Sequence, residues 1–140
     1  MLNKKTKLFK GYIEDNNKII TKIKINSLLS EKILIPNEQR IRDKDKVDEI
    51  IKYQDAYYKK GHNHFNFIGT INIHCCEEDE KNYLVDGQHR YKAMEFLFKQ
   101  YNYNDFYVKI EIVIVKTRND LKENYNLINK NTELPEFPED

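Results

Sequence analysis

The chain has 140 residues, and its 24 Lys and Arg nearly balance its 23 Asp and Glu, so its formal net charge is +1 at pH 7. This length fits one domain with one hydrophobic core, and the near-neutral charge excludes a strong overall attraction to nucleic acid or to an anionic membrane. Any contact with DNA must therefore come from a local patch. No apolar run approaches the roughly 20 residues of a membrane span, and the start lacks the apolar middle of a signal peptide.

These features predict a soluble protein of the cytoplasm or another intracellular compartment, with no membrane partner. The two cysteines, Cys75 and Cys76, are adjacent in the sequence. They cannot build a disulfide framework, which agrees with a reducing compartment. Lysine outnumbers arginine by 20 to 4, so an arginine is favoured where a planar, two-pronged hydrogen-bond donor is needed. Two of the four, Arg40 and Arg90, lie in segments that we single out below.

The N-terminal part predicts a basic β-hairpin. Residues 7–13, "KLFKGYI", and 18–25, "KIITKIKI", are rich in apolar residues and flank the turn "EDNN". Residues 1–32 carry eight Lys against three acidic residues. Such an arm either extends the sheet with a solvated edge or offers a patch to nucleic acid or a protein partner. We assign residues 1–29 to this extension, 30–132 to the core and 133–140 to an acidic, proline-bearing tail.

A strand and a helix follow the hairpin. The segment "KILIP" predicts a short strand that Pro36 ends. After a polar loop, apolar residues at helical spacing predict a helix over residues 45–60, with Gly61 as its stop. The segment "FNFIGTINI", residues 65–73, alternates as a strand does.

The second half predicts two further strand and helix pairs. An acidic turn leads into the strand "YLV", and a helix with an apolar stripe from Met94 to Tyr101 follows directly. The run "FYVKIEIVIV" predicts a strand covered on both faces near its end. The last helix, residues 119–131, would be capped by Asn119 or Asp120. The fold class is therefore α/β (α+β): a small mixed sheet with about three packed helices and the N-terminal hairpin.

The turn between "YLV" and its helix carries an unusual number of polar groups. Asp86 can cap the helix, and Gly87 permits a positive φ or the close approach of a ligand. The N–H groups of the first helical turn and the helix dipole favour an anion such as phosphate. His89 and Arg90 would add charged hydrogen bonds to the same anion. A surface turn with incidental polar residues is the alternative.

The sequence "YLVDGQHRYKAM" resembles the motif of the ParB/sulfiredoxin superfamily, in the form found in its DGQHR branch. That branch includes the regulator of DNA phosphorothioation and the nucleotidase half of modification-dependent restriction proteins. The resemblance extends upstream over "ILIPNEQRIRDKDKVDEII" and downstream over "NYNLINKNTELP", in the same order. It implies a small ParB/sulfiredoxin-like fold with a nucleotide phosphate at the helix N-terminus. Sulfiredoxin has its reactive cysteine where this chain has Gln88, so cysteine-sulfinate reduction is not expected.

The resemblance also implies roles for residues. The nucleotide-binding set by position is Gln39, Arg40, Gly87, Gln88, His89, Arg90, Asn129 and Asn131. Asp86, His89 and Arg90 would be catalytic, and Mg²⁺ would bridge phosphate oxygens rather than sit in a protein metal site. From the residues alone, a loosely paired surface Arg40 and a helix-end turn at Asn129 and Asn131 are equally good interpretations.

The function implied is a nucleoside triphosphate-binding domain and Mg²⁺-dependent nucleoside triphosphatase in DNA metabolism, restriction or virus–host conflict, in the host cytoplasm if viral. The base is not specified, and a protein partner or a homodimer is open. The alternatives are a non-catalytic DNA-binding regulator, which would use Lys4, Lys5, Lys7 and Lys10 of the hairpin, and a metal-dependent DNA nuclease of the same superfamily.

A second group of residues offers soft metal ligands. The group comprises His62, His64, His74, Cys75 and Cys76. Zinc prefers nitrogen and sulfur ligands, but neighbouring strand residues point to opposite faces, so both cysteines cannot bind one ion within a strand. We expect buried or incidental thiols. Phe65 and Phe67 would belong to the core, with base stacking as the alternative.

Overall fold

The computed structural model describes residues 18–36, 44–62, 70–103, 106–129 and 137. These residues form one five-stranded sheet in the order β1-β5-β3-β4-β2. Pairing alternates across it: β1 and β5 are antiparallel, β5 and β3 parallel, β3 and β4 antiparallel, and β4 and β2 parallel. The bounds are β1 Lys18–Lys24, β2 Ile33–Leu34, β3 Ile71–Cys76, β4 Lys81–Asp86 and β5 Tyr107–Val115. The predicted mixed α/β class is confirmed.

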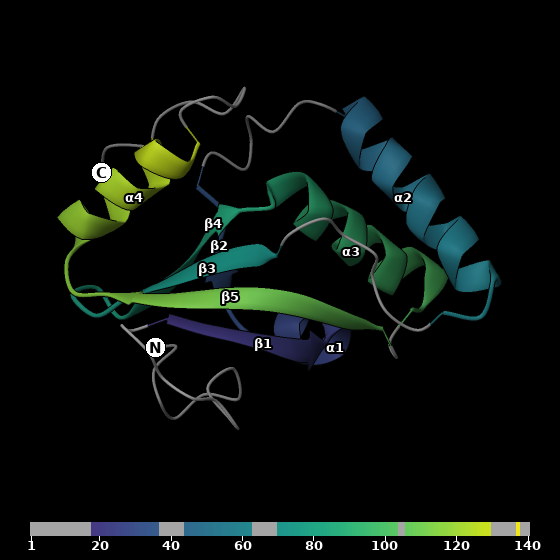
Figure 1. Cartoon of the computed structure of the whole chain (residues 1–140), viewed down its shortest axis with the longest axis horizontal. Helices are drawn as coiled ribbons and strands as arrows, with labels where there is room; N and C mark the ends of the chain where they lie inside the picture. Colours follow the sequence, from purple (N-terminus) through teal and green to yellow (C-terminus); the bar gives the residue numbers. More distant parts are fainter. Residues whose placement is uncertain (1–17, 37–43, 63–69, 104–105, 130–136, 138–140) are drawn as a thin grey trace.

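Helices cover both faces of the sheet. Those of the described residues are α1 Ile25–Ser30, α2 Lys44–Lys59, α3 Gln88–Tyr101 and α4 Arg118–Ile128. Figure 1 shows α4 at the opposite end of the molecule from α2, with α3 between α2 and β4. None of the described helices combines the length and the apolar character needed to cross a membrane.

The larger core lies on the face that α3 covers. Alternate strand residues such as Ile71, Ile73 and Ile110 point to this side, and each is fully buried. Helix α3 contributes Met94 and Leu97, both also fully buried. Because β-branched strand residues meet a helix stripe here, the apolar residues of both elements leave water together. This packing fixes the direction in which α3 leaves the sheet.

The smaller core lies under α4. It joins Leu121 and Tyr125 of α4 to Tyr83 and Val85 of β4, with Phe137 packed over them. The rings of Tyr125 and Phe137 meet edge to face, with centroids 5.3 Å apart. The tail was predicted as loop or frayed end, yet its residue Phe137 is buried. The backbone N–H of Phe137 donates to Asn126 Oδ1 at 2.7 Å.

The predicted N-terminal extension differs from the structure. Residues 7–13 lie outside the described residues, while residues 18–24 form β1 and pair with β5. The predicted second arm ends early, because Ile25 begins α1, a helix that the sequence did not predict. Ile25 and Leu28 are fully buried in the larger core. Residues 18–30 thus belong to the body of the fold rather than to an extension.

Three other boundaries shift. The strand predicted over residues 65–73 runs over 71–76, and residues 63–69, with Phe65 and Phe67, lie outside the described residues. The cap of α4 is neither Asn119 nor Asp120, because the side chain of Thr117 accepts from the N–H of Asp120 at 3.1 Å. Helix α2 occupies residues 44–59, within one residue of the prediction.

Candidate functional site

The turn from β4 into α3 is built around Gly87. Its φ is +90°, in the left-handed region, and Gly87 takes the N-cap position that was predicted for Asp86. A Cβ there would lie 3.2 Å from Ile71 Cγ1 and 3.4 Å from Ile71 Cα. The need for glycine is therefore explained by backbone conformation and by packing on β3. Because Gly87 has no side chain, none extends from the cap residue over the first turn of α3.

The side-chain amides of two buried residues hydrogen-bond to the backbone at this turn. Gln88 Nε2 donates to the carbonyl oxygen of Val85 at 3.0 Å, and Asn129 Nδ2 donates to the same oxygen at 2.8 Å. Asn129 Nδ2 also lies 3.0 Å from the carbonyl oxygen of Tyr125. The exposed fractions of the two amide residues are 3% and 4%. Together they join the start of α3, the end of β4 and the end of α4.

The charged residues of the motif lie at the same turn. Arg90 is half-buried, and its Nη1 donates to the carbonyl oxygen of Thr70 at 3.2 Å, which ties α3 to the residue before β3. His89 is also half-buried. Asp86 ends β4 opposite Asn72 of β3 and is partly exposed. The turn thus collects one carboxylate, one imidazole and one guanidinium within five residues.

The structure brings one distant predicted residue to this turn. Asn129 is 39 positions beyond Arg90 in the sequence, yet it shares an acceptor with Gln88. Gln39, Arg40 and Asn131 lie outside the described residues, so their approach to the turn stays a prediction. The nucleotide-binding and catalytic roles given to the motif also stay predictions.

A second polar group lies between β3 and α4. His74 is 2% exposed; its Nδ1 lies 2.8 Å from Asn72 Oδ1, and its Nε2 lies 3.1 Å from Asn124 Nδ2. These contacts fit a neutral ring that donates from Nδ1 and accepts at Nε2. Burial, reinforced by the charge of Lys18, lowers the pKa of His74 to about 4. The ring is therefore a neutral bridge from the sheet to α4 at physiological pH.

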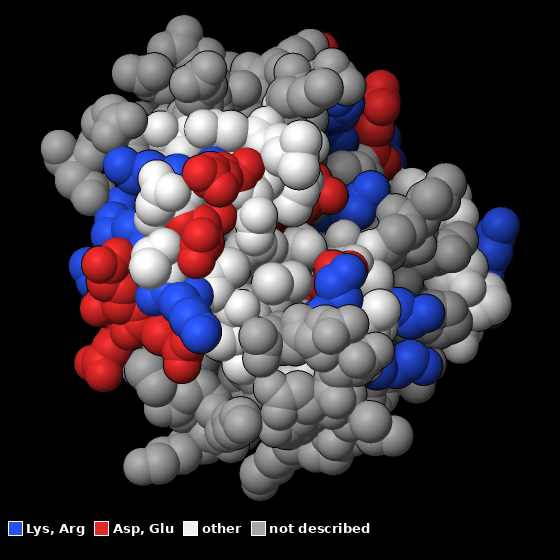
Figure 2. Space-filling view, turned by 60° about the vertical axis from the view of Figure 1, so that its left-hand side comes forward, with Lys and Arg blue, Asp and Glu red and all other residues white. Residues whose placement is uncertain are grey.

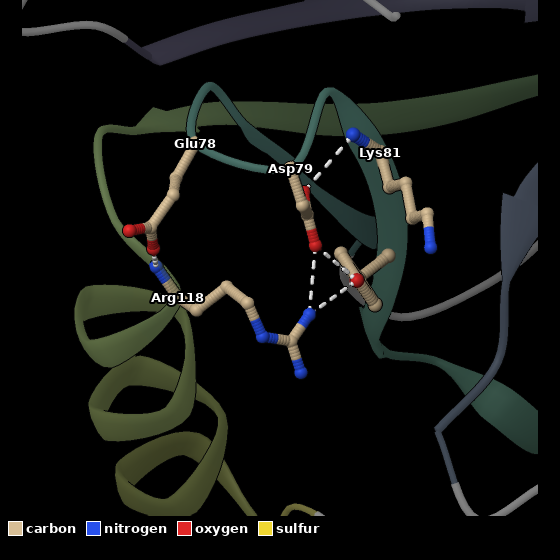
Figure 3. A network of polar contacts seen from close by, with 5 residues as sticks. Glu78, Asp79, Lys81 and Arg118 are labelled. Atoms are coloured by element: carbon tan, nitrogen blue, oxygen red, sulfur yellow. Dashed lines mark hydrogen bonds and ion pairs between the residues drawn. The ribbon is translucent and has the colours of Figure 1, made fainter. Parts of the chain in front are cut away.

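A third polar group lies at the far end of β4 (Figure 3). Arg118 Nη1 donates to Asp79 Oδ2 and to the Tyr83 hydroxyl oxygen, both at 2.7 Å, while the Tyr83 hydroxyl donates to Asp79 Oδ2 at 2.5 Å. The backbone N–H of Arg118 donates to Glu78 Oε1 at 2.8 Å. The Lys81 N–H donates to Asp79 Oδ1 at 3.1 Å. This network fixes the start of α4 against the β3–β4 turn.

The pKa values of this network favour an ionised Asp79 and a neutral Tyr83. Burial opposes the charged form of Asp79, but hydrogen bonds from Tyr83 and Arg118 outweigh it and hold the pKa of the carboxyl below its usual value. Burial and the adjacent Asp79 raise the pKa of Tyr83 to about 12. Neither group titrates near neutral pH, so the network has the character of a structural tie rather than of an acid–base centre.

A pocket of about 330 Å³ lies beside this network. Its lining residues are Glu31, Lys32, Leu34, Asp79, Glu80, Lys81 and Asn82. Three acids and two lysines line it together, so its charge favours neither an anion nor a cation. The face seen in Figure 2 likewise mixes blue and red side chains. This pocket lies at the end of β4 opposite to the Asp86–Arg90 turn.

The soft-ligand residues do not gather around one point. Cys75 packs in the larger core and Cys76 in the smaller one, on opposite faces of the sheet. Burial raises the pKa of both thiols. His62 stacks on Tyr57, with ring centroids 3.8 Å apart, and His64 lies outside the described residues. Within residues 18–36, 44–62, 70–103, 106–129 and 137, no three His, Cys, Asp or Glu are grouped so that they could hold a metal ion.

The Arg118 network was not predicted from the sequence. The scarcity of arginine, which singled out Arg40 and Arg90, applies equally to Arg118 and could have marked it. Its partners could not be named, because Asp79 and Tyr83 reach it only through the packing of α4 on β4, across 39 and 35 positions of sequence.

Comparisons with known proteins give one structural similarity to report. No protein-family model matches the chain, and no curated protein matches its sequence. Among solved structures, the chain is similar to sulfiredoxin from Arabidopsis thaliana, with 23% sequence identity and a TM-score of 0.40. The match covers 75% of this chain and 94% of that one. A similarity of this extent concerns the fold and says nothing about the activity of this chain.

Proposed function

We propose that the Asp86–Arg90 turn binds the phosphate groups of a nucleoside triphosphate. The observation that carries the proposal is the N-cap of α3, Gly87, a residue without a side chain that is followed in the first helical turn by His89 and Arg90. The first N–H groups of a helix have no acceptor inside it, and the helix dipole favours negative charge there. A guanidinium and an imidazole beside such an end can both donate to an anion with several oxygens, such as a polyphosphate.

The residues of the motif divide into two roles. Gln88 and Asn129 hold the turn through the carbonyl oxygen of Val85, so they position the helix start instead of contacting phosphate. Arg90 is tied to β3 by its bond to Thr70, and in this proposal its guanidinium group donates to the anion. His89 adds a second donor, and Asp86 is the carboxylate nearest in sequence to the bound phosphates.

In this proposal the chain is a DGQHR-type nucleoside triphosphatase that acts in DNA metabolism. A bound Mg²⁺ would neutralise phosphate charge, and Asp86 is the one motif side chain suited to ligate it, in keeping with an ion held chiefly by the nucleotide. Asp86 or His89 would orient the attacking water or accept its proton. His89 is the weaker base, because an adjacent phosphate dianion favours its protonated form.

The test is a panel of ATP, CTP and GTP with Mg²⁺, measured by calorimetry for binding and by phosphate release for hydrolysis. Arg90→Ala should weaken binding of the preferred nucleotide at least about 100-fold, the order expected when a charged hydrogen-bond donor to phosphate is lost. Lys99→Ala removes one positive charge from the exposed end of the same helix and should leave binding unchanged.

Three results contradict parts of this proposal. Binding that survives Arg90→Ala would remove the phosphate site from the turn. The absence of binding to all three nucleotides would remove nucleotide recognition altogether. Binding without phosphate release would make the chain a nucleotide binder and not an enzyme, and Asp86→Asn would then have no catalytic effect to measure.

A further inference from the structure

Among the helices of the described residues, α4 covers only part of its face of the sheet. Helix α4 packs on β3, β4 and β5, where it covers residues such as Val115, Tyr83 and Val85. The β1 edge of the same face, at the far side of β5, is exposed to solvent, and Figure 1 shows β1 away from α4. Ile20, in the middle of β1, is 60% exposed, whereas its neighbour Ile19 on the α3 side is 2% exposed.

This open area is basic. Register places residues 18, 20, 22 and 24 of β1 on one face with residues 113, 111, 109 and 107 of β5. The area therefore carries Lys18, Lys22, Lys24 and Lys109 together with Glu111, the one acidic residue in the two strands. Lys18 pairs with Glu111 at 3.2 Å. The other three lysines, Lys22, Lys24 and Lys109, are exposed and share an area whose one acidic residue on the two strands, Glu111, is paired with Lys18.

Two of these lysines lie directly opposite each other. Lys22 and Lys109 are cross-strand partners in the β1–β5 ladder. Like charges in directly opposite positions destabilise a sheet. The chain has near-neutral charge overall, so this concentration is local and is not a result of general basicity. A pair of like charges at one place on an otherwise balanced surface suits a site for an anion.

The area also contains an aromatic side chain. Tyr107 lies opposite Lys24, whose Nζ is 5.7 Å from the centre of the ring. Tyr107 is half-buried and does not belong to either core cluster. A flat sheet with lysines around an aromatic ring suits a flexible polyanion with rings of its own, because lysines meet phosphates and the ring stacks on a base. A flat sheet face cannot enter a duplex groove as a helix or a two-stranded ribbon does.

We propose that this surface, formed by Lys22, Lys24, Lys109 and Tyr107, binds single-stranded nucleic acid. The strand lies across β1 and β5, with its phosphates on the lysines and one base against Tyr107. This site is separate from the proposed nucleotide site at the Asp86–Arg90 turn, and it does not use Lys4, Lys5, Lys7 or Lys10, which lie outside the described residues. The two sites together would place a nucleotide and a nucleic acid strand on one domain.

The test is fluorescence anisotropy of a labelled oligo-dT of about 16 nucleotides, the upper end of a single-domain site. The triple variant Lys22→Gln, Lys24→Gln, Lys109→Gln should bind at least about tenfold more weakly than the wild type at about 50 mM salt. Its plot of log affinity against log salt should be shallower by about 2, since each lysine on a single-strand phosphate contributes about 0.7. Tyr107→Leu should weaken binding about tenfold and leave that slope unchanged.

The matched control is Lys44→Gln, Lys52→Gln, Lys60→Gln, which makes the same change in charge at exposed residues in and next to α2. It should bind like the wild type, as should Arg90→Ala, which reports only on the nucleotide site. Circular dichroism melts check that all variants are folded. Equal weakening in the control triple variant overturns the proposal, as does tighter binding to a duplex of the same length. Binding to vesicles of anionic lipid with none to the oligonucleotide would also overturn it.

Discussion

The two faces of the sheet are built from different chemistry. On the α3 face, strand and helix residues such as Ile73, Ile110 and Leu97 are fully buried apolar groups. On the α4 face, a small apolar cluster is interrupted by buried or partly buried polar groups at three levels: the Arg118 network, the His74 bridge and the Asn129 amide. Each of the three joins α4 to the sheet at a different point along the helix.

The apolar α3 face mainly stabilises the fold, whereas the polar groups of the α4 face determine where α4 lies. Apolar contacts are non-directional and stabilise in proportion to the area removed from water. Hydrogen bonds between buried polar groups contribute little net free energy but are costly to break on one side, so they select one placement of α4. The amide of Asn129 then carries that placement to the carbonyl oxygen of Val85, one residue before the Asp86–Arg90 turn.

The largest expected effect lies on the apolar face. Leu97→Ala should lower the free energy of unfolding by about 3 to 4 kcal/mol, because Leu97 is 0% exposed and its loss leaves a cavity in the larger core. Urea denaturation followed by circular dichroism measures the change. Leu127 of α4 is 69% exposed, so Leu127→Ala is the matched control and should change stability by less than about 0.5 kcal/mol. Equal losses in the two variants would contradict the burial assignment.

On the polar face, His74 should make stability depend on pH. Its pKa is lowered from 6.5 to about 4 in the folded state, so the unfolded chain binds the proton more readily. The contribution is complete above pH 6.5, falls as the pH decreases and is lost below about pH 4, for a total of about 3 kcal/mol. Protonation also sets a Nε2 proton against the amide hydrogens of Asn124.

Urea denaturation of the wild type and of His74→Gln between pH 7 and pH 4 measures this effect. Glutamine cannot titrate, so the variant should lack this part of the pH dependence while it keeps the part due to carboxylates. An imidazole resonance of His74 that titrates near pH 6.5 in NMR spectra would show that the ring is accessible to protons and that the bridge does not hold.

The Arg118 network should contribute less. Arg118→Ala removes two donors from Asp79 and Tyr83, at side-chain exposures of 23% for Arg118 and 16% for Asp79, and should cost about 2 kcal/mol of unfolding free energy. Thermal or urea denaturation measures it, and a double-mutant cycle with Tyr83→Phe isolates the coupling between Arg118 and the hydroxyl. Arg118→Lys keeps the charge but not the fork, so an undiminished stability in that variant would show that geometry is unimportant here.

Much of the fold could be predicted from local pattern. The helices at 45–60 and after Arg90, and the strand at 106–115, follow from periodicity that a buried stripe imposes on any such element. The burial of Met94 and Leu97 follows from the same pattern. The pattern also included Tyr101, which is instead 45% exposed at the end of α3. Helix α1 was missed because six residues give too short a window for a helical period to show.

The candidate site could be predicted only in its local part. Asp86 to Arg90 are contiguous, so their meeting at one turn needed no knowledge of the fold. The role of Gln88 depends on the carbonyl oxygen of Val85, and that of Asn129 on how α4 packs, which no local pattern contains. Gly87 illustrates the limit: the sequence allowed either a positive φ or the close approach of a ligand, and the structure shows the positive φ together with a contact to Ile71 of another strand that no local pattern contains.

The smallest expected effect lies on the open part of the α4 face and has the opposite sign. Lys109→Thr removes the repulsion from Lys22 across the β1–β5 ladder and should raise the free energy of unfolding by about 0.5 kcal/mol. Threonine also has a higher strand propensity than lysine, so the gain in stability has an electrostatic part and a propensity part. Salt separates the two: the electrostatic part should vanish near 1 M NaCl, where charges are screened within about 3 Å, and the propensity part should persist. Urea denaturation at low and high salt measures both parts.

In a Lys22→Thr background the electrostatic gain should already be absent, whereas a gain of the same size and salt dependence there would show that Lys22 is not the source of the repulsion. A sheet that becomes more stable when its exposed lysine is removed has kept that lysine for a reason other than folding, which is what a surface that binds an anionic strand requires.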